Sequence, residues 1–523
     1  MRVRMGTPTT RRTAALAAVL LCVALLLALA LASPVTLSTP PPVSGSSGEA
    51  AGAQRPNVVL IVTDDQPAHS LSSMPKTNRL LLDRGASFTD AVVTFPICCP
   101  SRATILTGQY AHNHGVLSNK ARYQGGYNRL SHRHTLPVWL KRAGYRTAHV
   151  GKYLNGYGRT TSRQRVPPGW ARWWGAPGQN AYRMWDYKLN HNGRLVHHGE
   201  RRRDYQTDVY ARLGARFIRA QKHRRKPFFL SIATLAPHDE AKKADPRRLK
   251  APRPAPRHRR AFRGSQLPDS PAFNERDVSD KPPYVARLPR LSARRKQLML
   301  RSYREQLRSL LAVDDLVARV VRALSSSGQL RDTYVIFTSD NGYLLGEHRL
   351  LGKSHPYEES VRAPIVIRGP GIEPGAELDG PAANLDLAPT ILDLTNATAD
   401  RRVDGISLFD AARGERPLPA RAILLENFDR DRHLETFDRR PDLPGLERRD
   451  MQRLPLFTGI RDRGWVYLEF KSGTRELYDL RSDPHELQNL ASEPAVAAIE
   501  AGLADRLERL RDCSGRSCSS SPN

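Results

Sequence analysis

The sequence predicts an α/β protein in which helices cover both faces of a large mixed sheet, with a smaller C-terminal antiparallel α+β domain. Short continuous apolar runs at 57–62, 228–235 and 333–337 are interleaved with helical patterns, and such runs are typical of strands buried on both faces. A chain of 523 residues exceeds the size at which one core keeps growing. Near the C-terminus, a turn separates two short strand patterns, 465–470 and 475–479.

Helical periodicity predicts the elements that cover the sheet. The longest pattern spans 292–327, begins at a suitable N-cap, Ser292, and carries one apolar stripe from Leu307 to Leu324. A further strand is predicted at 145–150, and another directly before Cys98. Shorter helices are predicted at 78–85, 136–144, 204–220, 386–394 and 493–511.

These elements suggest a larger catalytic domain at 55–405, a smaller C-terminal domain at 406–511 and a tail at 512–523. Only four cysteines lie outside the N-terminal apolar run, so the chain is not a disulfide scaffold. Cys513 and Cys518 in the Ser-rich tail are expected to close a small loop in an oxidising compartment.

The N-terminus has the order of an export signal. Residues 1–32 combine arginines with an apolar run from 14 to 32 that ends in small residues, and 33–54 read as a flexible linker. The run is also long enough to remain as an anchor, and Arg11-Arg12 allows a twin-arginine signal. We expect a secreted or cell-surface protein that touches the membrane only through this segment, if it is uncleaved.

The charge balance is strongly basic. Lys and Arg total 82 against 52 Asp and Glu, for a net charge of +30. This indicates a polyanionic partner such as a sulfated glycan, nucleic acid or an anionic surface, and coding bias toward Arg and Ala is the alternative. Residues 242–263, with ten Lys or Arg, one acid and four prolines, are expected to form an exposed, mobile insertion or an acidic-polymer contact.

Carboxylates follow two of the buried strand patterns. Asp64 and Asp65 stand at the end of the first, where open α/β sheets place ligands. Adjacent carboxylates repel each other unless they share a cation, although a solvated turn is the alternative. Asp340 and Asn341 follow the 333–337 pattern and complete a set of four oxygen ligands. Such a set suits one Ca²⁺ or Mg²⁺ better than Zn²⁺.

The stretch Cys98-Cys99-Pro100-Ser101-Arg102 is predicted to begin a helix and to carry a nucleophile. Proline suits the first turn, where backbone N–H groups and the positive helix end face any anion. This environment is expected to lower the pKa of a thiol and hold an oxyanion. The alternative is a pair of buried structural cysteines before a helix.

This stretch, with Leu106-Thr107-Gly108 after it, resembles the signature of the type I, formylglycine-dependent sulfatases. The resemblance implies an alkaline-phosphatase-like sulfatase fold. It also implies that a formylglycine-generating enzyme oxidises Cys98, whose hydrated aldehyde then attacks sulfur and also contacts the metal. Arg102 would support the modified residue, and Cys99 stands at a variable position.

Other segments fit the same family. Gly151-Lys152-Tyr153 resembles the motif whose lysine holds the sulfate, and a second lysine segment singles out Lys353. His238 lies at the carboxyl end of the 228–235 strand, which suits a sulfate ligand or leaving-group acid. Many relatives carry a histidine two residues after the first lysine, where this chain has Leu154.

The resemblance is strongest to the branch of N-acetylglucosamine-6-sulfatase and the extracellular heparan sulfatases, through 151–157, 312–317 and 369–372. It implies an exported sulfatase acting on 6-O-sulfated N-acetylglucosamine or a related sulfated glycan, with no nucleic-acid partner. Asp239-Glu240 and 346–349 depart from that branch and leave the sugar open. Two alternatives remain: a phosphodiesterase or phosphonate monoester hydrolase of the same superfamily, and a non-catalytic surface binder of acidic glycans.

Overall fold

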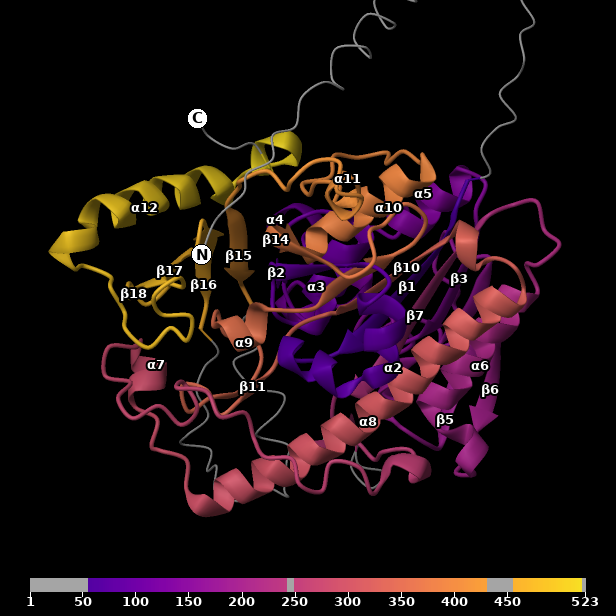
Figure 1. Ribbon diagram of the computed structural model, residues 1–523, viewed down its shortest axis with the longest axis horizontal. Helices are drawn as coiled ribbons and strands as arrows, with labels where there is room; N and C mark the ends of the chain where they lie inside the picture. Colours follow the sequence, from indigo (N-terminus) through magenta and orange to yellow (C-terminus); the bar gives the residue numbers. More distant parts are fainter. Residues whose placement is uncertain (1–54, 242–248, 430–454, 520–523) are drawn as a thin grey trace, which may run out of the picture. The chain divides into compact units, whose positions relative to one another are not determined.

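The computed structural model describes residues 55–241, 249–429 and 455–519. Its centre is a ten-stranded sheet with the strand order β14-β2-β13-β10-β1-β7-β3-β4-β5-β6 (Figure 1). The strands are β1 Asn57–Asp64, β2 Ala86–Val92, β3 Arg146–Gly151, β4 Arg172–Gly175, β5 Tyr187–His191, β6 Arg194–His198, β7 Phe228–Pro237, β10 Thr333–Ser339, β13 Ile365–Arg368 and β14 Ala376–Ala383.

The middle of this sheet is parallel. Strand β1 pairs in parallel with β10 and β7, β7 with β3, and β3 with β4, whereas β13 runs antiparallel to both β10 and β2. All residues of β1, β7 and β10 are buried, as the apolar runs predicted. Because parallel strands end at one edge, the residues after β1, β3, β7 and β10 meet there.

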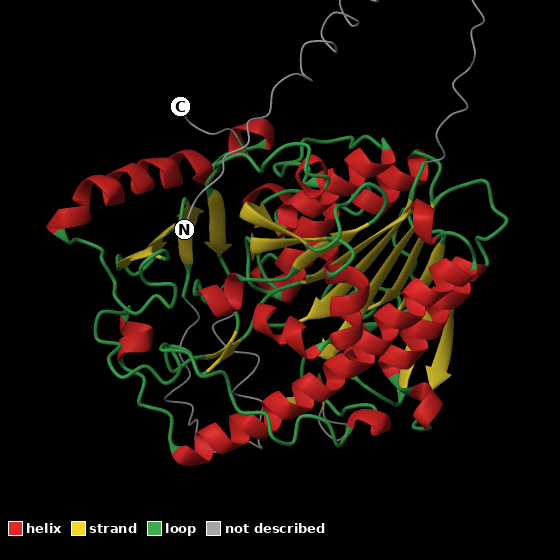
Figure 2. Ribbon diagram, viewed as in Figure 1, coloured by secondary structure: helices red, strands yellow, loops and turns green. Residues whose placement is uncertain are grey.

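Helices cover both faces of the sheet (Figure 2). Val59 and Ile61 point into one core with α6 (Gln206–Arg219) and α8 (Ala293–Ser326). Val58 and Leu60 point into the other core, with α3 (Cys98–Thr107), α5 (Leu136–Arg142) and α10 (Leu387–Thr395). Alternate residues of one strand thus supply two cores, which confirms the predicted layers. Ser292 caps α8 by accepting a hydrogen bond from the backbone N–H of Arg295.

A separate antiparallel sheet of four strands lies near the C-terminus, in the order β15-β16-β17-β18. The strands are β15 Ile423–Asn427, β16 Phe457–Asp462, β17 Trp465–Phe470 and β18 Arg475–Asp479, and α12 (Ala497–Arg511) packs on them through Leu503, Leu507 and Leu510. The sequence predicted β17, β18 and α12, but neither β15 nor β16. Cys513 and Cys518 form the expected disulfide.

Short elements complete the fold. The helices are α2 Pro75–Thr77, α4 Ala111–His114, α7 Pro283–Ala286, α9 Glu358–Val361 and α11 Phe409–Ala412, and the strands are β8 Glu240–Ala241, β9 Leu249–Lys250, β11 Leu344–Leu345 and β12 Leu351–Gly352. In place of the predicted helix at 78–85, α2 continues into a single wider turn, Asn78–Leu82.

The basic insertion differs from its prediction. Residues 242–248 lie outside the described residues, but the part from 249 onward is held in place. Strand β9 pairs with β8, Arg253 forms an ion pair with Glu240, and Arg257 bonds to Asp208 and Asp315. Several arginines of this part are exposed, as predicted, but the expectation of a mobile segment is not supported, because Arg253 and Arg257 pair with carboxylates on neighbouring elements.

No helix within the described ranges has the length and apolar character needed to cross a membrane. The predicted signal or anchor at 1–32 and the linker at 33–54 lie outside the described residues.

Candidate active site

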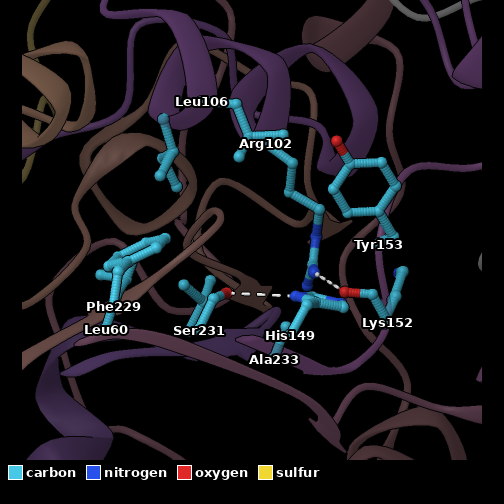
Figure 3. Close-up of a pocket in the computed structure, with 11 residues that line it drawn as sticks. Leu60, Arg102, Leu106, His149, Lys152, Tyr153, Phe229, Ser231 and Ala233 are labelled. Carbon is cyan, nitrogen blue, oxygen red and sulfur yellow. Dashed lines mark hydrogen bonds between the residues drawn. The ribbon is translucent and has the colours of Figure 1, made fainter. Parts of the chain in front are cut away.

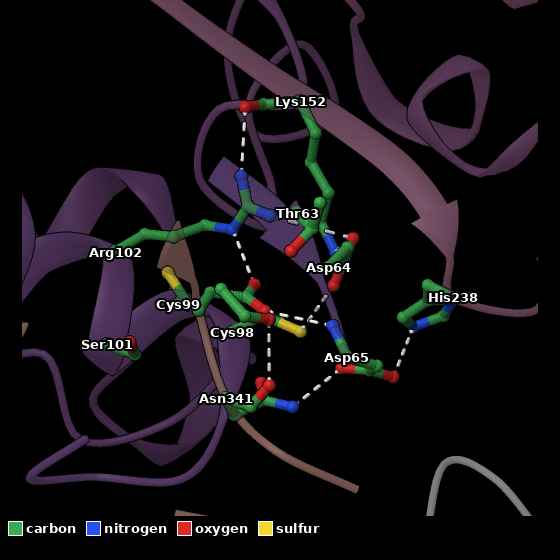
Figure 4. A network of polar contacts seen from close by, with 12 residues as sticks. Thr63, Asp64, Asp65, Cys98, Cys99, Ser101, Arg102, Lys152, His238 and Asn341 are labelled. Atoms are coloured by element: carbon green, nitrogen blue, oxygen red, sulfur yellow. Dashed lines mark hydrogen bonds and ion pairs between the residues drawn. The ribbon is translucent and has the colours of Figure 1, made fainter. Parts of the chain in front are cut away.

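The ends of β1 and β10 bring the predicted carboxylates together (Figure 4). The backbone N–H of Asp65 donates to Asp340 Oδ1 at 3.1 Å, and Asn341 Nδ2 donates to Asp65 Oδ1 at 2.8 Å. Asp65 has a φ of 62°, in the left-handed region that Asp tolerates better than most residues. This turn places its carboxylate beside that of Asp64, and both are buried.

Cys98 is the first residue of α3, and its side chain faces the carboxylates. Its Sγ atom lies 3.4 Å from Asp64 Oδ1 and 2.8 Å from Lys353 Nζ. The helix begins here as predicted, with Ser101 and Arg102 in its first turns. Cys99 instead lies in the hydrophobic core beneath the site.

The predicted lowering of the thiol pKa is wrong. Burial raises the pKa of Cys98 well above its ordinary value, and the nearby charges of Lys152 and Lys353 do not offset this effect. Helix position alone suggested the opposite, because the sequence does not reveal that the side chain is only 1% exposed. Burial therefore favours the neutral thiol form of Cys98.

Three buried cations face the carboxylates. Arg102 Nε lies 2.7 Å from Asp340 Oδ2, and its Nη1 donates to the carbonyl of Lys152 at 3.1 Å. Lys152 Nζ lies 2.5 Å from Asp64 Oδ2, and Lys353 Nζ lies 2.5 Å from Asp65 Oδ1. Buried charges persist only when they are paired, so cations and carboxylates hold each other in place.

The same charges keep the two aspartates ionised. Burial by itself would raise the pKa of Asp64, but Lys152, His238 and Arg102 bring it down to about 2. Burial also opposes ionisation of Asp65, and Lys353 and His238 lower its pKa. Both carboxylates are therefore charged at neutral pH, the form in which carboxylates bind metals.

His238 comes from the turn after β7. Its Nδ1–H donates to the carbonyl of Asp239 at 2.6 Å, which leaves Nε2 directed at the site, 3.6 Å from Asp65 Oδ2. Tyr182, which the sequence gave no reason to select, packs its ring 5.3 Å from that of His238 and 4.6 Å from Lys152 Nζ. It is the last residue of a short 3-10 helix, Gly178–Tyr182, and only the tertiary fold brings it to the site.

Four side chains form a possible metal site. Asp64, Asp65, Cys98 and His238 each place one ligand atom within 4.8 Å of the others. Asn341, whose Nδ2 bonds to Asp65, has a buried Oδ1 atom without a hydrogen-bond partner, and such an atom can serve as a further ligand.

A pocket lies behind the Arg102 guanidinium, between β1, β3, β7 and α3 (Figure 3). Its lining is mostly apolar, including Leu60, Leu106 and Phe229. The one imidazole there, His149, contacts Ser231 Oγ at 3.2 Å, and burial lowers its pKa to about 3. Because His149 is neutral, the positive charges that line this pocket are those of Arg102 and Lys152.

All of the predicted site residues thus converge at one sheet edge: Asp64, Asp65, Cys98, Arg102, Lys152, His238, Asp340, Asn341 and Lys353. Cations that surround a buried nucleophile position are suited to a tetrahedral anion with an ester bond. Fold and site therefore define a hydrolase of anionic esters.

Comparisons with known proteins identify the family. Residues 56–397 match the Sulfatase family model, and the chain is 33% identical over 503 residues to the N-acetylglucosamine-6-sulfatase of Capra hircus, covering 91% of this chain and 86% of that protein. The chain belongs to the sulfatase family, and its activity is the hydrolysis of sulfuric esters.

Solved structures agree with the fold. BT4656 in complex with its substrate D-glucosamine-2-N,6-O-disulfate aligns with a TM-score of 0.69 at 23% identity, covering 89% of this chain and 98% of that one. The phosphonate monoester hydrolase of Agrobacterium radiobacter aligns with a TM-score of 0.64 at 24% identity, covering 87% and 95%. At these identities the likeness is one of fold.

Proposed function

We propose that this chain is an exported sulfatase that removes the sulfate from 6-O-sulfated N-acetylglucosamine or a related sulfated glycan. The observation that carries the proposal is the convergence of Cys98, three buried cations and a set of oxygen ligands at one sheet edge. The sugar is supported by the similar protein named N-acetylglucosamine-6-sulfatase and by the sugar substrate bound to BT4656.

Five residues would hold one Ca²⁺ or Mg²⁺ ion: Asp64, Asp65, Cys98, Asp340 and Asn341. When bound, the ion supplies positive charge that stabilises the anionic sulfate group. The unpartnered Asn341 Oδ1 and the ionised state of Asp64 and Asp65 support this assignment.

The nucleophile would come from Cys98. We propose that a formylglycine-generating enzyme oxidises this residue, and that the hydrated aldehyde supplies an oxygen nucleophile. The Sγ atom marks the place from which that oxygen would act, beside Lys353 and Asp64.

The remaining residues would bind the sulfate ester, accept a proton from the nucleophile and donate one to the departing alcohol. Lys152 and Lys353 would bind sulfate oxygens. Their attraction to the sulfate would strengthen as the substrate excludes water from the site. Arg102 pairs with Asp340, and the Asp340 carboxylate would accept the proton of the nucleophile. His238 Nε2 faces the site and would donate a proton to the departing alcohol.

Loss of sulfate release on substitution of Cys98, but not of Cys99, tests this assignment. We expect Cys98→Ala to abolish hydrolysis of N-acetylglucosamine 6-sulfate and Cys99→Ala to retain most of it, because the latter side chain lies in the core. Folding of each variant is checked by thermal unfolding. The reverse pattern would contradict the role of Cys98.

The main alternative is a phosphodiesterase or phosphonate monoester hydrolase, which the fold likeness to the Agrobacterium enzyme supports. Rates on an aryl sulfate and an aryl phosphate diester separate the two functions. A non-catalytic glycan binder would instead retain its binding in Cys98→Ala and release no sulfate from any substrate.

For the chain as a whole, we propose that residues 1–32 direct export and that 33–54 link this segment to a catalytic domain at 55–405. Residues 406–511 would form the smaller C-terminal domain, and 512–523 its tail. The basic N-terminus with its apolar run supports a secreted or cell-surface location.

A further inference from the structure

A second cluster of metal-ligand side chains lies outside the residues assigned to the active site. His348, Glu359 and Glu486 each place one ligand atom within 4.8 Å of the others. His348 comes from the loop between β11 and β12, Glu359 from the first turn of α9, and Glu486 from the loop after β18. The fold therefore gathers them from three separate segments.

Each member has a buried polar atom without a partner. His348 Nε2, Glu359 Oε2 and Glu486 Oε1 accept and donate no hydrogen bond within the described structure. His348 is 0% exposed and Glu486 1% exposed, so water does not readily satisfy these atoms. Buried polar atoms in native proteins are normally hydrogen-bonded, so three unpartnered atoms within one cluster indicate a missing ligand.

Neighbouring groups orient these atoms. His348 Nδ1 lies 2.7 Å from Glu275 Oε2, and its ring packs 4.2 Å from that of Tyr357. A carboxylate on one ring nitrogen fixes the tautomer that leaves the lone pair of the other nitrogen free for a metal. Glu486 Oε2 accepts the backbone N–H of Glu358 at 2.9 Å, which leaves Oε1 for the cluster.

Nearby cations are engaged elsewhere. Lys281 Nζ bonds to Asp280 and to the carbonyl of Leu487, and Arg461 bonds to Asp90 and Glu358. Among the described residues, no Lys or Arg lies within ion-pair distance of Glu359 or Glu486. The buried carboxylate of Glu486 and the half-buried carboxylate of Glu359 thus lack a cation that would neutralise them.

We propose that His348, Glu359 and Glu486 bind a second metal ion, Zn²⁺, with a fourth position for water. One imidazole and two carboxylates form a donor set that suits Zn²⁺. The ion would join the loop after β18 to the segment 348–359, which also carries Lys353. The proposal rests on this geometry and is independent of the proposed function.

The test is Zn²⁺ uptake by the purified full-length chain in excess Ca²⁺, measured by elemental analysis after removal of free metal. We expect about one Zn²⁺ per chain in the wild type. His348→Gln and Glu359→Gln should weaken binding at least about tenfold. His114→Gln removes another buried histidine, and Asp65→Asn removes a ligand of the proposed active-site ion; both should keep the Zn²⁺.

A second test is X-ray absorption spectroscopy at the zinc edge. It uses the wild type alone, so it does not depend on whether the variants fold. We expect a first shell of nitrogen and oxygen with one imidazole. A sulfur neighbour would place the zinc on Cys98 and overturn the proposal. Failure of the folded wild type to take up zinc, or equal uptake by wild type and Glu359→Gln, would overturn it as well.

Discussion

At the scale of single residues, the site is an arrangement of charges that are stable only together. Asp64, Asp65 and Asp340 would be costly to bury without Lys152, Lys353 and Arg102, and the reverse also holds. Each cation pairs with a carboxylate here and, in the proposed mechanism, would also contact the sulfate. The same contacts thus serve both stability and the proposed catalysis.

Lys353 offers the sharpest residue-scale prediction, because its Nζ contacts both Cys98 and Asp65. Lys353→Met keeps the length of the side chain and removes the charge. We expect kcat/KM on a sulfate ester to fall by on the order of a hundredfold, corresponding to about 3 kcal/mol of lost transition-state stabilisation. Steady-state kinetics measures this change.

The matched control is Lys76→Met, which removes an ion pair to Asp315 from a lysine whose side chain is 41% exposed. Exposed pairs contribute little, so its kcat/KM should stay near that of the wild type. Equal losses in the two variants would show that the charge of Lys353 has no special role.

At the scale of elements, the buried strands of the large sheet were predictable, whereas β15 and β16 of the C-terminal sheet were not. Continuous apolar runs predicted β1, β7 and β10. Both faces of these strands are buried, so both sets of alternating side chains are apolar. Strands β15 and β16 had no such signal, because their pairing is decided by contacts with β17 and with each other.

The candidate site was predictable for a related reason. Asp64, Lys152, His238 and Asp340 each follow a buried strand, and parallel strands end at one edge. Motif resemblance added Lys353, which follows the two-residue strand β12 and no strand of the large sheet. The thiol pKa and Tyr182 were not predictable, because burial and ring packing depend on segments that are distant in sequence.

An ion pair between α4 and β15 gives an element-scale prediction. Burial alone would lower the pKa of His112, but its hydrogen bond and charge interaction with Glu426 raise it to about 9. A raised folded-state pKa means that the pair stabilises the fold fully below pH about 6.5, the ordinary value for His. This contribution is lost as pH rises through 9.

Thermal unfolding of the wild type and His112→Gln between pH 6 and pH 10 tests this pair. We expect the wild type to be more stable by on the order of 1 kcal/mol at pH 6, and the difference to shrink toward pH 10. A difference that does not change with pH would contradict the charged state of His112.

At the scale of the whole molecule, the net charge of +30 points to a polyanionic partner. A sulfated polysaccharide would be attracted over distances that exceed a single contact, and salt would screen that attraction. The positive charge would therefore speed the association of a sulfated polysaccharide with the protein, and it would affect a small sugar sulfate less. The chemistry of the site would be the same for both.

Salt dependence separates these contributions. Between low salt and about 0.5 M salt, we expect kcat/KM on a sulfated polysaccharide to fall by about tenfold or more, while the value on the monosaccharide sulfate changes little. Equal salt effects on both substrates would favour coding bias as the origin of the charge.

Cys98 is proposed to be the precursor of the nucleophile, and the mass of the peptide that contains it is the decisive measurement. In a preparation with sulfatase activity, we expect this peptide to carry the mass of the aldehyde or its hydrate, with Cys99 still a thiol. An active preparation in which Cys98 is entirely an unmodified thiol would contradict the account.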